Sequence, residues 1–195
     1  MTGNTLTLLM ALLLDNGAAG KAVKIPVEGL SRSVCNQSNS QAFWLPDDQG
    51  LRIEFREVSA SSSKGLTRKK LNCELNLLIP VPRGKRLRLI ESQLNFDFQR
   101  PDLGQGFLSM RFRPSGQSSE ATSVALPEGQ GNASLELPGG ALSPCSEGEV
   151  PFSLNVFGVV RTENLRRSNE LGQNTSISLN ELQGNFKLVN CNDSY

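Results

Sequence analysis

The sequence contains no histidine, and its 195 residues include one tryptophan and one tyrosine. The absence of histidine excludes Ser-His-Asp catalysis, imidazole metal ligands and imidazole general bases. No GxSxG motif occurs, so a serine hydrolase built on a nucleophile elbow is excluded as well. The shortage of tryptophan and tyrosine leaves few large rings for a surface that stacks sugars.

The chain also lacks an excess of charge. It has 20 Lys and Arg against 19 Asp and Glu, which gives a net charge of +1. A near-neutral chain is neither a bulk electrostatic polyanion binder nor a charge-driven disordered protein, so we expect no nucleic-acid partner. Its length fits one domain with a sizeable core better than two domains.

Long apolar runs are absent except at residues 6–14, LTLLMALLL. A helix needs about 20 apolar residues to cross a bilayer, so we expect no membrane span. An apolar run of this length followed by small residues is typical of a secretory signal, although residues 1–5 carry no Lys or Arg. We expect a signal peptide at 1–20, one domain at 21–195, and a secreted protein, with periplasm and cell surface as alternative locations. A buried core element is the other interpretation of the run.

Four cysteines occur, Cys35, Cys73, Cys145 and Cys191, and no two of them form a CxxC pair. Structural zinc sites draw ligands from close pairs, so we expect no metal and no cofactor. An even number of cysteines behind a secretory signal predicts two disulfides, and four cysteines allow three connectivities. Free thiols in a cytosolic core are the alternative.

Apolar residues alternate with polar ones along most of the chain, as at 51–56, 73–81 and 150–156. This period of two is typical of half-buried strands, and no window past the signal shows a helical stripe. We therefore predict an all-β fold: a two-sheet antiparallel sandwich, jelly-roll or immunoglobulin-like, stabilised by disulfides. The predicted core includes Leu51, Ile53, Phe55, Leu75, Leu77, Ile79, Phe152, Leu154 and Val156, with Arg52, Glu54 and Arg56 exposed.

In two stretches, 86–98 and 177–188, the apolar residues change from one parity to the other. Such a switch predicts a β-bulge or a corner between sheets. The sequence PDDQG at 46–50 predicts a hairpin turn in which Gly50 accepts a positive φ. A calcium site is the alternative there, but the regular D-x-D-x-D-G spacing is missing. Residues 114–132 and 59–65 are predicted to be mobile connections.

The order of the cysteines and their neighbouring motifs carries a resemblance. RKKLNCELNL at 68–77 is followed by IPVPRG at 79–84, a lone cysteine precedes them at Cys35, and SPC at 143–145 precedes a last cysteine at Cys191. Together they resemble a four-cysteine family of small secreted proteins of fungi and bacteria, a domain of unknown function. Around Cys35 this chain has Val-Cys-Asn where the family tends to have Gly-Cys-Pro. The resemblance implies secretion and one β-rich domain, and it supplies no chemistry.

Basic residues concentrate between positions 64 and 88, where eight of them face one glutamate, giving +7 against −6 for the rest. A strand between the two halves of this segment would hold them apart at opposite ends of a sheet. Solvated edge charges are the simpler explanation, and binding of an anionic glycan, lipid or envelope polymer is the alternative. The candidate ligand-binding residues are Lys64, Arg68, Lys69, Lys70, Arg83, Lys85 and Arg86.

Two aromatic residues and a set of carboxylates are the remaining candidates. Phe107 lies on the parity opposite Leu108 and is predicted to be exposed, while Trp44 fits a core hairpin better than a glycan platform. A glycosidase needs only two carboxylates. The candidates are Glu54, Glu57, Glu91, Asp97 and Asp102, most of them on polar strand faces. The favoured function is thus a secreted, non-enzymatic binding or envelope-associated module, and the alternative is a small secreted hydrolase that uses an Asp/Glu pair on a glycan.

The disulfide partners follow from a predicted hairpin. If 150–161 and 174–190 pair about a centre near residues 168–169, position 146 lies opposite Cys191, next to Cys145. That register nearly supplies the Cα separation a disulfide needs, about 4.4–6.8 Å. Cys35 would then pair with Cys73, with the segment before Phe43 folded back over the sheet.

Overall fold

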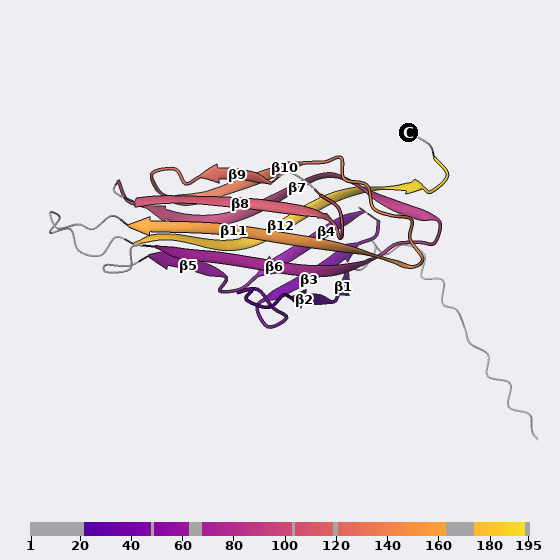
Figure 1. The fold of residues 1–195 in the computed structure, drawn as a ribbon, viewed down its shortest axis with the longest axis horizontal. Helices are drawn as coiled ribbons and strands as arrows, with labels where there is room; N and C mark the ends of the chain where they lie inside the picture. Colours follow the sequence, from indigo (N-terminus) through magenta and orange to yellow (C-terminus); the bar gives the residue numbers. More distant parts are fainter. Residues whose placement is uncertain are drawn as a thin grey trace, which may run out of the picture.

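The computed structural model describes residues 22–47, 49–62, 68–102, 104–118, 121–162 and 174–193. These residues form two antiparallel β-sheets that pack face to face, which confirms the predicted all-β sandwich. In Figure 1 the long strands β6, β8 and β11 lie side by side along the long axis of the molecule. Over the described ranges, no helix is long and apolar enough to cross a membrane. The predicted signal peptide at 1–20 lies outside them.

The smaller sheet has five strands in the order β2-β6-β11-β8-β9. Its three long central strands alternate buried and half-exposed side chains over most of their length. The members are β2 (Val27–Gly29), β6 (Lys69–Pro80), β11 (Glu149–Thr162), β8 (Gly104–Pro114) and β9 (Thr122–Ala125).

The larger sheet has seven strands, in the order β1-β3-β4-β12-β7-β10, with β5 paired to one end of β12. Its two longest strands, β7 and β12, lie next to each other at its centre. The members are β1 (Val23–Ile25), β3 (Ser40–Leu45), β4 (Gly50–Phe55), β12 (Thr175–Asn190), β7 (Lys85–Arg100), β10 (Gly129–Pro138) and β5 (Ser59–Ser62).

All nine residues predicted for the core are buried between the sheets. At its centre the rings of Phe152 and Phe186 meet edge to face at 5.3 Å, and Phe112 lies 5.4 Å from Phe152. Such contacts add to the stabilisation that burial of the rings provides. Of the residues predicted to be exposed, Arg52 is half-buried and forms an ion pair of 3.3 Å with Glu54, because both lie on the outward side of β4.

The two parity switches predicted from the sequence coincide with irregularities in the β7–β12 ladder. The pairing shifts between Leu179 and Glu181 and again between Asn185 and Phe186, and the second shift lies opposite Ile90. Each extra residue turns the following side chains to the other side of the strand, so the apolar parity changes while the core side stays the same. The prediction of β-bulges is confirmed.

The predicted hairpin of 150–161 with 174–190 is wrong. β11 lies between β6 and β8 in the five-stranded sheet, and β12 lies between β4 and β7 in the other sheet. The alternation in each strand identifies the side that faces the core, but it does not identify the hydrogen-bonded neighbour. The two strands therefore lie across the core from each other.

Two connections predicted to be mobile contain strands. Residues 59–62 form β5 along β12, and β9 forms within the 114–132 stretch along β8. At the predicted turn between β3 and β4, the residue with positive φ is Gln49, at 48°, rather than Gly50. The hairpin itself is present, with Leu45 paired to Gly50.

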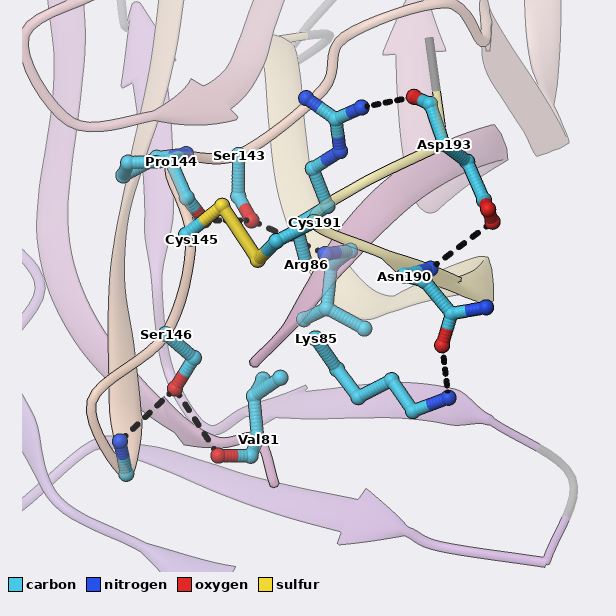
Figure 2. The surroundings of a disulfide bond; sticks show 12 residues. Val81, Lys85, Arg86, Ser143, Pro144, Cys145, Ser146, Asn190, Cys191 and Asp193 are labelled. Atoms are coloured by element: carbon cyan, nitrogen blue, oxygen red, sulfur yellow. Dashed lines mark hydrogen bonds between the residues drawn. A yellow bond between two sulfur atoms is a disulfide. The ribbon is translucent and has the colours of Figure 1, made fainter. Parts of the chain in front are cut away.

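The structure contains the disulfides Cys145–Cys191 and Cys35–Cys73, the partners named from the sequence. Cys145 meets Cys191 because their segments lie on either side of the start of β7. The N–H of Ser146 donates to the carbonyl of Lys85 at 2.8 Å, and the N–H of Cys191 donates to the carbonyl of Gly84 at 3.0 Å. A shared neighbour, rather than a hairpin, brings the two cysteines together (Figure 2).

Cys35 reaches Cys73 because the segment after β2 continues along the edge of β6. The N–H of Val34 donates to the carbonyl of Asn72 at 2.8 Å, and the N–H of Leu30 donates to that of Glu74 at 3.2 Å. The segment thus lies at the edge of the five-stranded sheet, whereas the sequence analysis expected it to fold back over the sheet. Both cysteines of this pair are fully buried.

The fold predicts that two neighbouring leucines, Leu77 and Leu78, contribute very differently to the free energy of unfolding. Leu77 is 1% exposed, so Leu77→Ala should lower the free energy of unfolding by about 2–5 kcal/mol through lost transfer energy and a cavity. Leu78 on the other side of β6 is 41% exposed, and Leu78→Ala should change it by about 0.5 kcal/mol or less. Urea titration followed by the fluorescence of Trp44 measures both. A loss below about 1 kcal/mol for Leu77→Ala would contradict the assigned core.

Candidate functional site

The side of the five-stranded sheet that faces away from β7 and β12 is here called the outer face. At the end of this face where β11 finishes and β6 begins lies a cavity of about 450 Å³. Its lining combines cationic, amide and apolar groups from two adjacent strands, β8 and β11, and from the residue before β6. The lining residues are Arg68, Gln105, Gly106, Phe107, Val159 and Arg161.

Phe107 is the exposed aromatic residue of this cavity. Its side chain is 39% exposed, as the parity of β8 predicts. The ring of Phe157 on β11 lies 5.9 Å away at an angle of 51°, because Phe107 pairs with Val159 and Phe157 is therefore its diagonal neighbour. The two rings form an apolar patch between polar groups on a rigid sheet.

Two arginines flank this patch at the end of the sheet. Lys69 pairs with Val160, so Arg68 and Arg161 occupy the next positions on β6 and β11 and lie side by side. Within the described ranges neither side chain forms an ion pair. Two guanidinium groups beside an aromatic patch can bind anionic groups of a ligand that packs on the ring.

A buried hydroxyl cluster on the core side fixes the end of β11. Thr162 is 8% exposed, its hydroxyl lies 2.5 Å from that of Ser62, and it also donates to the hydroxyl of Thr175 at 3.3 Å. The Thr175 hydroxyl in turn donates to the backbone carbonyl of Arg161 at 3.3 Å. With Thr162 held inward, the alternation of the strand turns Arg161 to the outer face.

The six basic candidates within the described residues divide between the two ends of β6, as the sequence predicted. Arg68 directly precedes β6, Lys69 and Lys70 are its first residues, all three are exposed, and Arg68 lines the cavity. Lys64 lies outside the described residues. Lys70 shares the outer face with Arg68, whereas Lys69 lies on the alternate parity.

The other three basic candidates lie near the Cys145–Cys191 disulfide and donate to the chain itself. Arg83 donates through Nε to the carbonyl of Glu147 at 3.2 Å, and Arg86 donates through Nη2 to the carbonyl of Asp193 at 2.7 Å. Lys85 donates to the side-chain amide oxygen of Asn190, as Figure 2 shows. Lys85 and Arg86 thus bond Asn190 and Asp193 to the start of β7, and Arg83 bonds the segment before β11, which gives this cluster a structural role.

Trp44 takes no part in an exposed platform. It is 4% exposed, and its ring lies edge to face against Phe186 at 5.7 Å. This outcome matches the core position that the sequence favoured. The aromatic partner of Phe107 is Phe157 instead, which sequence reasoning missed.

None of the five candidate carboxylates lines this cavity, and three of them, Glu54, Glu91 and Asp97, are engaged with neighbouring side chains. Asp97 accepts a hydrogen bond from Asn132, and Glu91 accepts one from Asn185 at 2.8 Å. Glu57 and Asp102 are exposed on the turns after β4 and β7. Across the described part of the chain, no three metal-ligating side chains gather in one place.

Glu91 also borders a second cavity, of about 480 Å³, on the outward side of the larger sheet. Glu136 on β10 lines the same cavity and pairs with Gln93, so the two glutamates are diagonal neighbours, with Cβ atoms about 7–8 Å apart. That spacing suits a glycosidase pair, but both side chains are exposed. The environment lacks the burial that makes one carboxyl a general acid near neutral pH.

The exposed ring of Phe107 should matter little for stability. Phe107→Ala removes one ring contact and should lower the free energy of unfolding by about 1 kcal/mol. Phe112 on the same strand is 1% exposed, so Phe112→Ala should cost about 3–5 kcal/mol. Urea titration of both variants is the measurement, and equal losses would mean that Phe107 belongs to the core.

Comparisons with known proteins give no close relative. No family model and no curated protein matches the chain. Among solved structures, the chain is similar to the module TmCBM61 in complex with β-1,4-galactotriose, with a TM-score of 0.26, 10% identity, and 85% of this chain and 88% of that chain covered. It is similar to the CBM22-2 xylan-binding domain of Paenibacillus barcinonensis Xyn10C, with a TM-score of 0.22, 10% identity, and 85% and 87% covered. It is also similar to a protein of the Israeli acute paralysis virus particle, with a TM-score of 0.28, 12% identity, and 100% and 87% covered.

Proposed function

We propose that this protein is a secreted, non-enzymatic β-sandwich module that binds an anionic glycan or envelope polymer at the Phe107 cavity of its outer face. The observation that carries the proposal is the exposed Phe107 in one cavity of about 450 Å³ with Arg68 and Arg161, its ring in contact with the half-buried Phe157 next to the cavity. Membership of the four-cysteine family of secreted proteins is part of the same proposal.

Secretion is supported by the two disulfides. Such bonds persist in oxidising compartments and are rare in the cytosol. They close chain segments with sequence separations of 38 and 46 residues, and each should stabilise the domain by about 2–4 kcal/mol. The apolar run at 6–14 agrees with this location.

The composition of the cavity supports an anionic sugar as its ligand. The C–H faces of a sugar ring pack on an aromatic ring, and the Phe107–Phe157 pair offers such a surface at 39% exposure of Phe107. The guanidinium groups of Arg68 and Arg161 suit carboxylate or sulfate groups, which they can bind with two parallel hydrogen bonds. Because the groups sit on a sheet, little ordering is needed when the ligand binds.

The alternative function is hydrolysis by Glu91 and Glu136 in the second cavity. Their diagonal positions on β7 and β10 favour it, and their exposure counts against it. The two functions use opposite sides of the sandwich, so single substitutions separate them.

Binding of polygalacturonate to the mature protein, measured by isothermal titration calorimetry, tests the proposal. Arg161→Gln and Phe107→Ala should each weaken binding about tenfold, since each removes a charge-assisted or aromatic contact. Arg83→Gln, a matched change at the other end of β6, should leave the affinity unchanged. Added salt should weaken binding of the wild type.

Two results would contradict the proposal. Binding that is lost in Arg83→Gln and kept in Arg161→Gln would place the site at the disulfide end. Release of reducing ends from the polymer that disappears in Glu91→Gln would show that the protein is the hydrolase.

A further inference from the structure

The outer face carries two more arginines beyond the Phe107 cavity. Arg111 and Arg113 have the same parity as Phe107 on β8, and both are half-buried. Neither forms an ion pair with any residue that the structure describes. The Nε of Arg111 is shielded from solvent and lacks a hydrogen-bond partner within the same residues. An arginine on the outer face without an ion-pair partner can bind an anionic group through its guanidinium nitrogens.

On the outer face β8 is bordered by β9 from Phe107 to Met110 and by β11 along its whole length. On β9 the outward residues are Ser123 and Ala125, which are small and lie opposite Ser109 and Phe107. On β11 the residues opposite Arg111 and Arg113 are Asn155 and Ser153. Apart from the ring of Phe157, which lies opposite Ser109, these short side chains border a track along β8 with hydrogen-bonding groups.

Carboxylates on the outer face lie away from this track. Glu74 on β6 accepts a hydrogen bond from Asn155 at 3.2 Å, and Glu28 pairs opposite Asn76 on β2. Glu149 lies at the first residue of β11, beyond Arg113 toward the other end. β11 therefore divides the described part of the outer face. Arg111 and Arg113 lie on the β8 side of β11, and Glu28 and Glu74 lie on its β6 side. On the β6 side Glu28 and Glu74 offset the charges of Arg68 and Lys70, whereas the outward residues of β8 include two arginines and no carboxylate, so a polyanion is attracted toward β8.

The length of the track follows from strand geometry. Six residues separate Phe107 from Arg113, which corresponds to about 20 Å at about 3.3 Å per residue. Arg68 and Arg161 lie at the Phe107 end, so two cationic pairs stand at the two ends of one straight strand. A single charged sugar can contact one pair, and only an extended chain can contact both.

We infer that the ligand is an internal stretch of a linear, repeatedly charged glycan that lies along β8, with its anionic groups held by Arg68 and Arg161 at one end and by Arg111 and Arg113 at the other. This inference rests on the proposed function and adds the shape, charge pattern and direction of the ligand. A branched or singly charged sugar would occupy only the Phe107 end.

Oligomers of increasing length test the inference. Affinities of the wild type for oligogalacturonates and for sulfated dextran oligomers should rise with length until the track is filled. In Arg113→Gln the loss of affinity should grow with length and reach about tenfold for the longest oligomers, the effect of one charge-assisted contact. Arg113→Lys should recover part of it, and thermal unfolding shows whether the variants are folded.

Two further variants distinguish binding along this track from an effect of the protein's net charge on affinity. Glu74→Gln removes the carboxylate nearest the track and should strengthen binding of long oligomers, with Asn155 still able to donate to the amide oxygen. Lys187→Gln, on the outward side of the larger sheet, lowers the net charge as Arg113→Gln does and should leave every affinity unchanged.

The outcomes distinguish the inference from the proposed function. If Phe107→Ala weakens all oligomers while folded Arg113→Gln and Arg111→Gln weaken none, the site is confined to the cavity and the inference is overturned. If neither series of oligomers binds the wild type, the proposed function fails together with it. Length dependence that Arg113→Gln removes in either series supports the inference, and the series that shows it identifies carboxylate or sulfate as the anionic group.

Discussion

The candidate site depends on the burial of one side of β6, β8 and β11 against the opposite sheet. Leu77, Phe112 and Phe152 fill the space between the sheets, and in a pleated strand this commits every second residue to the core. The intervening residues therefore lie on the outer face. On these strands they include Phe107, Phe157, Arg111, Arg113 and Arg161. A shift of one residue in any of the three strands would exchange the two sets, so the apolar core holds the binding groups in register.

The two ends of the sandwich use their cations differently, and the disulfide explains the difference. At the Cys145–Cys191 end, Lys85 and Arg86 donate to Asn190 and Asp193 and bond that segment to β7, and Arg83 donates to Glu147 before β11. At the other end the hydroxyl cluster around Thr162 secures the strands from the core side, so Arg68 and Arg161 form no ion pair with described residues and face the cavity. The basic residues between positions 64 and 88 look like one cluster in the sequence. In the structure, those near the disulfide have a structural role, and Arg68 at the other end is in a position suited to binding.

Patterns along one strand were predictable from the sequence, and relations between strands were not. Alternation identified the core and the exposure of Phe107, and the parity switches identified the bulges of β7 and β12. The hairpin of β11 with β12 was wrong because alternation says nothing about which strand is the neighbour, yet Cys145 and Cys191 still pair because both segments border the start of β7. The positions of Phe157, Arg161, Arg111 and Arg113 along one shared face could not be predicted without knowing the β11–β8 register. The signal that could have found them is their position on the polar parity of strands whose other side is apolar.

The most direct test of this account is a map of ligand contacts by nuclear magnetic resonance. In the ¹⁵N-labelled protein titrated with an oligogalacturonate long enough to span β8, the largest amide shifts are expected on β8 and β11, from Phe107 to Arg113 and around Phe157 and Arg161. Little change is expected on β10 and β12. Shifts concentrated around Glu91, Glu136 and Asn185, or around Gly84 and Arg86, would contradict the account, because the ligand would then lie on the opposite sheet or at the disulfide end.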